Sequence, residues 1–378
     1  MPYITIPQSP IYHQLTLDEI LSGAVNLGIV RTNETNTRTF FTYKRGDKLY
    51  KYEDIADIIQ TLSRFTAKYA DLYAVDRQTL YHKFYIPKRS GGLREINAPL
   101  DPLMNALREL KDIFENKCHA LYHTSAMAYM KGRGTIDAVK RHQQNNSHWF
   151  LKVDFHDFFG STTKEFTMNT LKQIVPFNLV CEYPSGMAAL ERAVDLCFLN
   201  GGLPQGTPIS PMLTNLLMIP VDYKLSKKLR NFNGQQFVYT RYADDMLISS
   251  LRDFKPAEIQ QLIRDVLAEC NAPYTFKEEK TRYGSRSGSN WNLGVMLNKD
   301  NNITVGHKKK KYFRAILTNY ILDKQHDKNW SVEDVAKMNG MLSYYKMVER
   351  EYFDGLIDSM NSKYNVNLSA LIKADLAI

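Results

Sequence analysis

Apolar positions along the chain follow two different spacings, and each spacing predicts a different kind of element. Short apolar or β-branched runs predict strands at 147–155, near 274–276 and at 291–297, and hairpins at 81–99 and 237–250. Helical spacing predicts helices at 53–73, 101–118, 134–145, 163–175, 186–198, 210–230 and 256–270, followed by a helical C-terminal region. The helix at 210–230 is expected to have Ser210 as its N-cap and Pro211 at its first helical position, and to kink at Pro220.

The order of these elements predicts the fold class. A strand, several helices, a hairpin, a helix and a strand match an α+β, ferredoxin-like sheet in which one crossover is elaborated. This topology places the strand that ends at Asp154 beside the hairpin of 237–250. Asp154 is therefore expected to face Asp244 and Asp245 across the sheet.

Two adjacent aspartates interrupt the apolar hairpin FVYTRYADDMLISS at 237–250. Neighbouring carboxylates repel one another, so the arrangement costs stability unless a positive charge compensates. Three carboxylates around two divalent ions are typical of phosphoryl-transfer sites, and oxygen-only ligands favour Mg²⁺. The alternative is that Asp244 and Asp245 only form a hairpin turn.

Composition and charge narrow the class of partner. The chain has 378 residues, of which 44% are hydrophobic and 24% charged, enough for a large core divided into two or three lobes. Its net charge of +9 favours a polyanionic partner. No apolar run reaches the roughly 18 residues of a membrane span, and the start MPYITIPQSP lacks the regions of a signal peptide. We therefore expect a cytoplasmic protein without a membrane partner.

The cysteines and histidines do not indicate a zinc site. The cysteines form no CxxC pair, which favours buried thiols over a metal site or disulfides; they are Cys118, Cys181, Cys197 and Cys270. His119 and His123 are spaced as ligands on a helix would be, but only Cys118 and no third His is near them in sequence, which favours core or surface histidines.

Three segments resemble, in order, the motif series of the prokaryotic reverse transcriptases, a group that includes group II intron, retron and phage-defence enzymes. The segments are LKVDFHDFFGST at 151–162, GLPQGTPISPMLTN at 202–215 and RYADD at 241–245. The resemblance runs from about residue 80 to residue 360. It implies a right-hand polymerase fold, with an N-terminal extension at 1–78, fingers at 79–150, a ferredoxin-like palm with finger insertions at 151–300 and a helical thumb at 301–378.

The resemblance assigns the chemistry to a small group of residues. Asp154, Asp244 and Asp245 match the metal-binding carboxylates, and the backbone carbonyl of Phe155 matches a further ligand. Lys280 in FKEEKTRY resembles the lysine that is proposed to protonate the departing pyrophosphate. The alternative for Lys280 is a solvated side chain.

Other residues match positions that hold the incoming nucleotide. Lys88 or Arg89, together with Arg94, would clamp the triphosphate, since arginine suits bidentate phosphate contact. The ring of Phe159 would lie under the sugar and collide with a 2′-hydroxyl, which favours deoxynucleotides; the alternative is a core phenylalanine. The remaining candidates are Asp157, which we expect to shape the turn, Phe158, Gln205 and Gly206.

The resemblance also indicates where primer and template bind. Tyr242, Leu293 and Gly294 match positions beside the primer end. A basic run in the C-terminal lobe would follow the phosphates of a duplex, unless it is only a solvated helix face; it consists of Lys308, Lys309, Lys310, Lys311 and Arg314.

The implied function is RNA-directed DNA polymerisation with two Mg²⁺ ions, for which Mn²⁺ is a candidate substitute. The partners would be dNTPs, an RNA template and a DNA product. DAVKRH at 137–142 and NLGVML at 292–297 depart from the retron patterns, which favours a defence-associated or unclassified enzyme that copies a dedicated noncoding RNA. An accessory or effector protein is a further candidate partner. The alternatives are a retron enzyme making msDNA, an RNA-making or template-independent polymerase, a metal-dependent nuclease and a non-catalytic nucleic-acid-binding scaffold.

Overall fold

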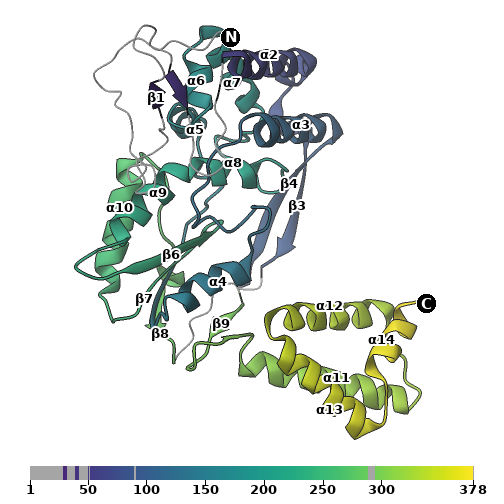
Figure 1. The fold of residues 1–378 in the computed structure, drawn as a ribbon. Coiled ribbons are helices and arrows are strands. Elements are labelled where there is room, and N and C mark those ends of the chain that lie inside the picture. The colour runs from purple at the N-terminus through teal and green to yellow at the C-terminus, as the bar shows by residue number, and fades with distance from the viewer. Residues whose placement is uncertain are drawn as a thin grey trace. The chain divides into compact units, whose positions relative to one another are not determined.

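The computed structural model describes residues 29–31, 39–41, 50, 52–88, 91–287 and 294–377. These residues form a mixed α+β fold, whose elements are drawn in Figure 1. Contacts divide the chain into two units. One unit contains the described residues up to Arg133, together with Leu151–Ile248 and Phe254–Arg282. The other contains Gly134–Phe150, Ser249–Asp253 and the described residues from Tyr283 onward.

The first unit begins with small strands, helices and a two-stranded ribbon. Its elements up to the ribbon and the following helix are β1 (Ile29–Arg31), β2 (Thr39–Phe41), α2 (Tyr52–Lys68), η1 (Ala70–Tyr73), η2 (Arg77–Leu80), β3 (Tyr81–Pro87), β4 (Leu93–Pro99) and α3 (Asp101–Lys117). Strands β3 and β4 pair antiparallel from Tyr81↔Pro99 to Pro87↔Leu93, which confirms the predicted hairpin. Most side chains of β3 are exposed, so the ribbon presents a large accessible surface.

A four-stranded sheet holds the residues that the sequence predicted to converge. Its strands are β5 (Trp149–Asp154), β6 (Phe237–Tyr242), β7 (Asp245–Ser250) and β8 (Arg282–Ser285), in the order β6-β7-β5-β8. The first strand in sequence therefore lies between the third and the fourth, as the ferredoxin-like topology predicts. The crossover from β5 to β6 is elaborated, as expected, with α5 (Lys164–Leu171), α6 (Phe177–Cys181), α7 (Pro184–Asp195), α8 (Ser210–Leu217) and α9 (Ile219–Leu229). Helix α10 (Pro256–Glu269) connects β7 to β8.

The fourth strand differs from the prediction. The segment 274–276 forms only an isolated bridge, Phe155↔Phe276, and β8 begins after a short 3-10 turn, η3 (Glu278–Lys280). The prediction was wrong because the apolar run 274–276 packs its rings under the end of β5 instead of extending the sheet. Tyr274 is buried there, with its ring centroid 5.3 Å from that of Phe155.

The predicted helix at 210–230 is divided in two. Helix α8 ends at Leu217 and α9 begins at Ile219, so the chain breaks just before Pro220, where a kink was predicted. The predicted N-cap was wrong. Ser210 is the first residue of α8, and its hydroxyl donates to the carbonyl of Pro204 at 3.0 Å instead of capping the helix.

The second unit contains a helical C-terminal region with a core of its own. Its elements are α4 (Thr135–Gln144), β9 (Met296–Leu297), β10 (Ile303–Thr304), α11 (His307–Gln325), α12 (Val332–Val348), α13 (Arg350–Tyr364) and α14 (Leu368–Leu376). Helices α11 to α14 bury apolar side chains together, among them Phe313, Tyr320, Leu342, Phe353 and Leu368. The predicted strand at 291–297 appears as β9, and its residues 291–293 lie outside the described residues. In the described part of the chain, no helix combines the length and apolar character that a membrane span requires.

Candidate active site

The end of β5 lies against the turn of the β6–β7 hairpin. The backbone N–H of Phe155 donates to the carbonyl of Asp244 at 3.2 Å. Ala243, which begins the turn, has φ of +55°, a left-handed conformation that lets the chain reverse between Tyr242 and Asp245. Asp154 and Asp244, which lie far apart in sequence, are thereby brought to neighbouring positions.

A buried arginine fixes this turn from below. Arg241 is 1% exposed, and its guanidinium donates to both carboxylate oxygens of Asp222, at 2.9 and 2.6 Å. The same guanidinium donates to the side-chain oxygen of Asn215 and to the backbone carbonyl of Ala243. Four hydrogen bonds therefore hold the guanidinium of Arg241 to the hairpin turn and to helices α8 and α9.

The carboxylates at the turn interact electrostatically. Burial raises the pKa of Asp244, and the nearby charge of Asp154 raises it further, against the opposing effect of Lys277 and Lys280. Burial also raises the pKa of Asp245 to about 6, even though the ammonium of Lys152 acts to lower it. A group of carboxyl groups that resist ionisation together is a place where a cation is stabilised.

A second segment supplies positive charge to Asp154. The backbone N–H of Lys277 donates to the carbonyl of Asp154 at 2.8 Å, and His156 donates to Thr275 at 2.8 Å, so the chain after 274 follows the end of β5. Lys280 Nζ lies 3.2 and 3.3 Å from the two carboxylate oxygens of Asp154. Lys277 Nζ lies 3.7 Å from one of them. Asp154 thus has two ammonium groups beside it.

Lys277 and Lys152 were missed in the sequence. Lys152 Nζ lies 2.8 Å from Asp245 Oδ1. Lys152 precedes Asp154 by two residues on β5. Because residues two apart on a strand point to the same face, the sequence did indicate that Lys152 lies on the same face as Asp154. Lys277 comes directly before the 3-10 turn η3, which ends at Lys280. That Lys277 lies near Asp154 can be inferred only once this turn is known.

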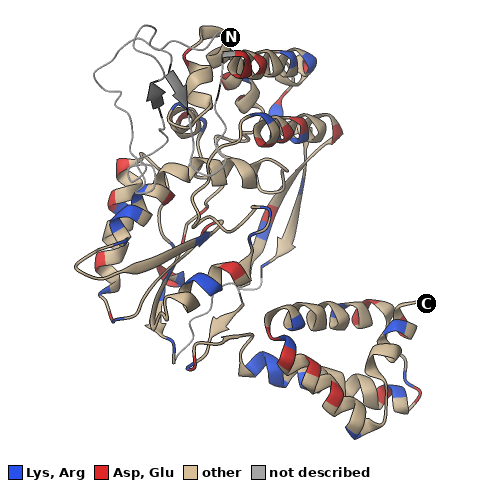
Figure 2. Cartoon of the chain, in the orientation of Figure 1, with Lys and Arg blue, Asp and Glu red and all other residues tan. Residues whose placement is uncertain are grey.

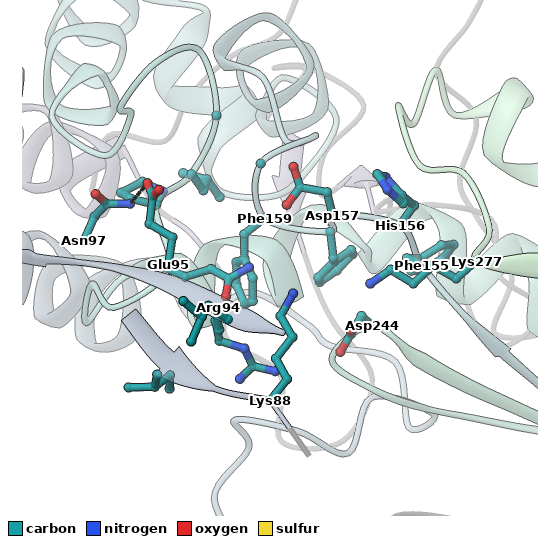
Figure 3. Close-up of a pocket in the computed structure, with 18 of the residues that line it drawn as sticks. Lys88, Arg94, Glu95, Asn97, Phe155, His156, Asp157, Phe159, Asp244 and Lys277 are labelled. Carbon is teal, nitrogen blue, oxygen red and sulfur yellow. Dashed lines mark hydrogen bonds between the residues drawn. The ribbon is translucent and has the colours of Figure 1, made fainter. Parts of the chain in front are cut away.

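Asp244, Lys277 and Lys280 line a cavity of about 1310 Å³ in the first unit, whereas Lys152, Asp154 and Asp245 are not among its lining residues. The predicted residues that line it are Lys88, Arg94, Phe155, Asp157, Phe158, Phe159, Gln205, Asp244 and Lys280. Figure 3 shows Lys88 and Arg94 reaching in from the β3–β4 ribbon, with Asp244 and Lys277 on the other side of the cavity. A cavity between a basic ribbon and an acidic turn can hold a ligand that carries phosphates and cations together.

The turn at the tip of the β3–β4 ribbon positions the side chains of Lys88 and Arg94. The backbone N–H of Lys88 donates to the carbonyl of Gly92 at 2.9 Å, which closes the turn that contains Gly91 and Gly92. Both glycines have positive φ, as this turn requires. Arg89 lies outside the described residues.

Two neighbouring phenylalanines have different surroundings. Phe158 is 3% exposed, and its ring stacks on Phe155 with centroids 5.5 Å apart. Phe159 is half-buried and lies at the cavity wall. Phe159 is therefore better placed than Phe158 to meet a ligand. Asp157 is exposed with φ of +40°, consistent with its predicted part in shaping the turn.

The loop before α8 is joined to the ribbon. Asn97 on β4 donates its backbone N–H to the carbonyl of Gln205 at 2.8 Å. Gly206 has φ of +113°, and a Cβ there would lie 2.8 Å from Ile96 Cγ2 and 3.0 Å from the carbonyl oxygen of Asn97. Only glycine fits this close approach without a shift of the ribbon or the loop.

The remaining predicted residues occupy other places. Tyr242 is half-buried at the end of β6, and Leu293 lies outside the described residues. In the second unit, Lys309 donates to the carbonyl of Gly294 at 2.6 Å. Lys310 is held in an ion pair with Glu349 at 2.6 Å.

The exposed part of the basic run is correspondingly smaller than the sequence indicated. Lys308, Lys311 and Arg314 are exposed near the start of α11, where Figure 2 shows a concentration of basic residues. Lys309 and Lys310 are half-buried by their own contacts within the second unit. The phosphate track predicted for the thumb therefore has three outward-facing cations.

Comparison with known proteins identifies the family. The family model described as "Reverse transcriptase (RNA-dependent DNA polymerase)" matches residues 86–313, more than half of the chain. The chain belongs to the reverse transcriptase family. It is accordingly an RNA-directed DNA polymerase, and the family implies the use of a divalent metal ion.

The similar curated proteins include bacterial retron enzymes. The Retron Ec73 reverse transcriptase of Escherichia coli is 26% identical over 75% of this chain and 86% of its own length. The Retron Ec83 reverse transcriptase of the same species is 25% identical over 84% and 97%. This reverse transcriptase is therefore retron-like.

A solved structure of telomerase from Candida albicans, in complex with a fragment of telomeric RNA, is also similar. It is 12% identical with a TM-score of 0.41, and the match covers 91% of this chain and 65% of that one. The assignment to the family rests on the sequence matches and not on this overlap.

Gly206→Ala is expected to destabilise the reverse transcriptase by about 1–3 kcal/mol, because the methyl group meets the ribbon and the backbone cannot keep its φ without strain. Gly234→Ala is the control, since Gly234 also has positive φ, +69°, but nothing lies within 4 Å of an added Cβ. The control should lose only the backbone contribution, about 1 kcal/mol. Urea unfolding measures both, and an equal loss would contradict the close approach to β4.

Mg²⁺ is expected to stabilise the reverse transcriptase most strongly above the raised pKa of Asp245, about 6. In the metal-free protein, the raised pKa values mean that the folded chain keeps protons that the unfolded chain releases near pH ~4. The free energy of unfolding therefore falls as the pH rises from about 4 through that value, because the folded state then carries buried charge. A cation binds tightly only after the protons have left.

The test is the melting-temperature difference between Mg²⁺ and EDTA, measured at about pH 5 and about pH 7.5 in wild type and in Asp244→Asn. The difference should grow with pH in the wild type and largely vanish in the variant. A difference that is independent of pH, or that the variant retains, would show that the ion binds elsewhere.

Proposed function

We propose that this retron-like reverse transcriptase extends a primer with deoxynucleotides on a dedicated noncoding RNA template, using two Mg²⁺ ions held at Asp154 and Asp244. The observation that carries the proposal is a cavity with Asp244 at one wall and Lys88 and Arg94 at the opposite wall. The hydrogen bond from Phe155 to Asp244 joins the end of β5, and so Asp154, to this wall. A nucleoside triphosphate chelated to a cation matches this distribution of charge.

The residues at the turn fit the proposed ions. In the described part of the chain, no three acidic, His or Cys side chains are gathered so as to enclose a metal on their own. Mg²⁺ does not need such a cage, because it is commonly bound by one or two carboxylates together with substrate phosphates and water. Asp154 and Asp244 would supply the carboxylates, with Asp245 and the carbonyl of Phe155 as the further predicted ligands. When bound, the ions lower the pKa of the primer hydroxyl and stabilise negative charge on the phosphates.

The side chains of the cavity take the remaining roles. Lys88 or Arg89, with Arg94, bind the triphosphate, and Gln205 and Gly206 contact the nucleotide and its template base. Lys280 holds the carboxylate of Asp154, which would also be the carboxylate that holds a cation. Lys280, whose side chain is 45% exposed, can then turn toward the pyrophosphate and donate its proton.

The proposed domains follow the polymerase plan. The ribbon β3–β4 and the segment to 150 act as fingers, 151–300 as the palm and the helices from 301 as the thumb, with 1–78 as an N-terminal extension. Exposed basic residues on α11 support a thumb that follows the phosphates of a duplex; they are Lys308, Lys311 and Arg314. Tyr242, Leu293 and Gly294 are proposed to contact the primer end.

The retron relatives favour a noncoding RNA as the template, since both curated relatives named above are retron enzymes. DAVKRH and NLGVML depart from the retron patterns, which makes a retron enzyme the second candidate. We propose an antiphage defence role with a protein effector as the biological context of the DNA product. Sequencing the RNA and DNA that copurify with the protein from its host tests the template.

Asp244→Asn is expected to lower primer extension on RNA by roughly 10³-fold, because a carboxylate that stabilises the ions is worth several kcal/mol in the transition state. Asp112→Asn on α3 is the control, since Asp112 is exposed and does not line the cavity. Incorporation of labelled dNTP into a primed RNA measures both variants. Unchanged incorporation in Asp244→Asn would contradict polymerisation at this site and favour a scaffold role.

Phe159→Ala is expected to relax the choice of sugar, because the ring at the cavity wall no longer excludes a 2′-hydroxyl. Discrimination between dNTP and NTP, measured as the ratio of kcat/KM, should fall by about tenfold or more. Phe254→Ala serves as the control for loss of a half-buried ring away from the cavity. An unchanged ratio in Phe159→Ala would favour the RNA-making alternative.

A further inference from the structure

Tyr129 lies in the loop between α3 and α4 in a conformation that requires support. Its φ is +57°, which is uncommon for an aromatic residue, and its side chain is 50% exposed. A non-glycine residue held in this region costs of order 1–3 kcal/mol and persists only when its surroundings impose it. Strain of this kind on an exposed aromatic ring points to a functional position.

Hydrogen bonds to the residues around Tyr129 impose this backbone conformation. Met127 donates its backbone N–H to the carbonyl of Arg241 at 2.9 Å, and Asn215 donates to the carbonyl of Ala128 at 3.2 Å. Arg133 donates to the carbonyl of Ala126 at 2.8 Å. The loop is therefore anchored to the same arginine that fixes the hairpin turn, and Tyr129 is carried at a set position beside the site.

Tyr129 borders two cavities. One is the cavity of about 1310 Å³ that contains Asp244. The other, of about 350 Å³, lies in the same unit and is lined by Phe114, Glu115, His119, Ala120, Tyr122, Met130, Lys131, Met212 and Asn215. Tyr129 and Asp244 line the same larger cavity. Burial raises the pKa of Tyr129, and the charge of Asp244 raises it further, against the opposing effect of Arg241 and Arg94.

The smaller cavity suits a flat, partly apolar ring. Phe114, Met130 and Met212 give it apolar walls, and its volume is at the low end of the roughly 300–1,000 Å³ of small-molecule sites. Lys131 is exposed at this cavity, where an ammonium group can meet a phosphate. This combination of aromatic side chain, apolar pocket and adjacent cation is how proteins hold single-stranded bases.

We propose that the smaller cavity binds the unpaired template nucleobase that follows the one being copied, with the ring of Tyr129 stacked between the two. This inference rests on the proposed polymerase function. The base that pairs with the incoming nucleotide must lie in the large cavity beside Asp244. The next base of the strand must leave that cavity past its border, and Tyr129 is the aromatic side chain at the border with a second pocket behind it.

The test uses a DNA primer annealed to an RNA template with a single-stranded 5′ overhang. 2-Aminopurine replaces the template base after the copying position, or, as the positional control, a base several nucleotides further on. Binding of the wild-type protein should change the emission of the first probe and not of the second. Extending the overhang from one nucleotide to two should also tighten binding by about tenfold, the effect of one stacked base.

Variants separate stacking from folding. Tyr129→Asn removes the ring but keeps a residue that adopts the left-handed conformation readily, so the loop should fold. It should lose both the emission change and the gain from the second nucleotide, whereas Tyr129→Phe should retain them. Tyr85→Leu is the matched control, because Tyr85 is 53% exposed on β3 and borders neither cavity.

Two outcomes would overturn the inference while leaving the polymerase proposal intact. The wild-type protein could extend the primer but leave the first probe unchanged, or Tyr129→Asn could behave as the wild type does. If the wild-type protein extended no primer on any template, the proposed function itself would fail, and this inference with it.

Discussion

The backbone hydrogen bond from Phe155 to Asp244 is the contact on which the site depends. It joins the end of the first strand of the sheet to the turn of the central hairpin, and so places Asp154 beside Asp244. Arg241 holds this hairpin turn in place, because its buried guanidinium donates hydrogen bonds to Asp222, Asn215 and Ala243. A buried ion pair contributes little net stability after desolvation, but breaking it leaves an uncompensated charge, so it strongly disfavours other registers of the hairpin.

The same arginine connects two parts of the mechanism. It sets the hairpin turn that carries Asp244, and its backbone carbonyl accepts a hydrogen bond from the loop that carries Tyr129. The acidic turn and the proposed template contact are thus positioned by one residue. Two of the three carboxylates near the turn form ion pairs within the protein, Asp154 with Lys280 and Lys277 and Asp245 with Lys152. In the metal-free state these ammonium groups perform part of the electrostatic role that a cation would take.

The sequence predicted the strand order of the sheet and the convergence of Asp154 with Asp244, because periodicity and element order determine a ferredoxin-like topology. It could not predict which lysines reach the acids. Lys277 approaches Asp154 only because the rings of 274–276 pack under β5 and displace the fourth strand to 282–285. Ser210 was misassigned as a cap for a similar reason, since its hydroxyl bonds to Pro204, a contact made by the loop's tertiary fold.

Tyr129 gave no signal in the sequence, because its position depends on a backbone conformation that Arg133, Asn215 and Arg241 impose from three distant segments. The basic run of α11 shows a different limit of prediction from the sequence. Its charges are obvious in the sequence, but Lys309 and Lys310 turn inward to Gly294 and Glu349, contacts that charge counting cannot anticipate.

The convergence of two carboxylates on a shared cation is the claim that a single measurement can decide. Fe²⁺ bound in place of Mg²⁺ reduces added hydrogen peroxide to hydroxide and a hydroxyl radical, which cuts the backbone next to the ion, so the cleavage fragments report which segments surround it. The account predicts cuts at two places in one preparation, beside Asp154 and beside Asp244, and the loss of both cuts in Asp154→Asn. Cleavage at only one of these segments, or at neither, would contradict it.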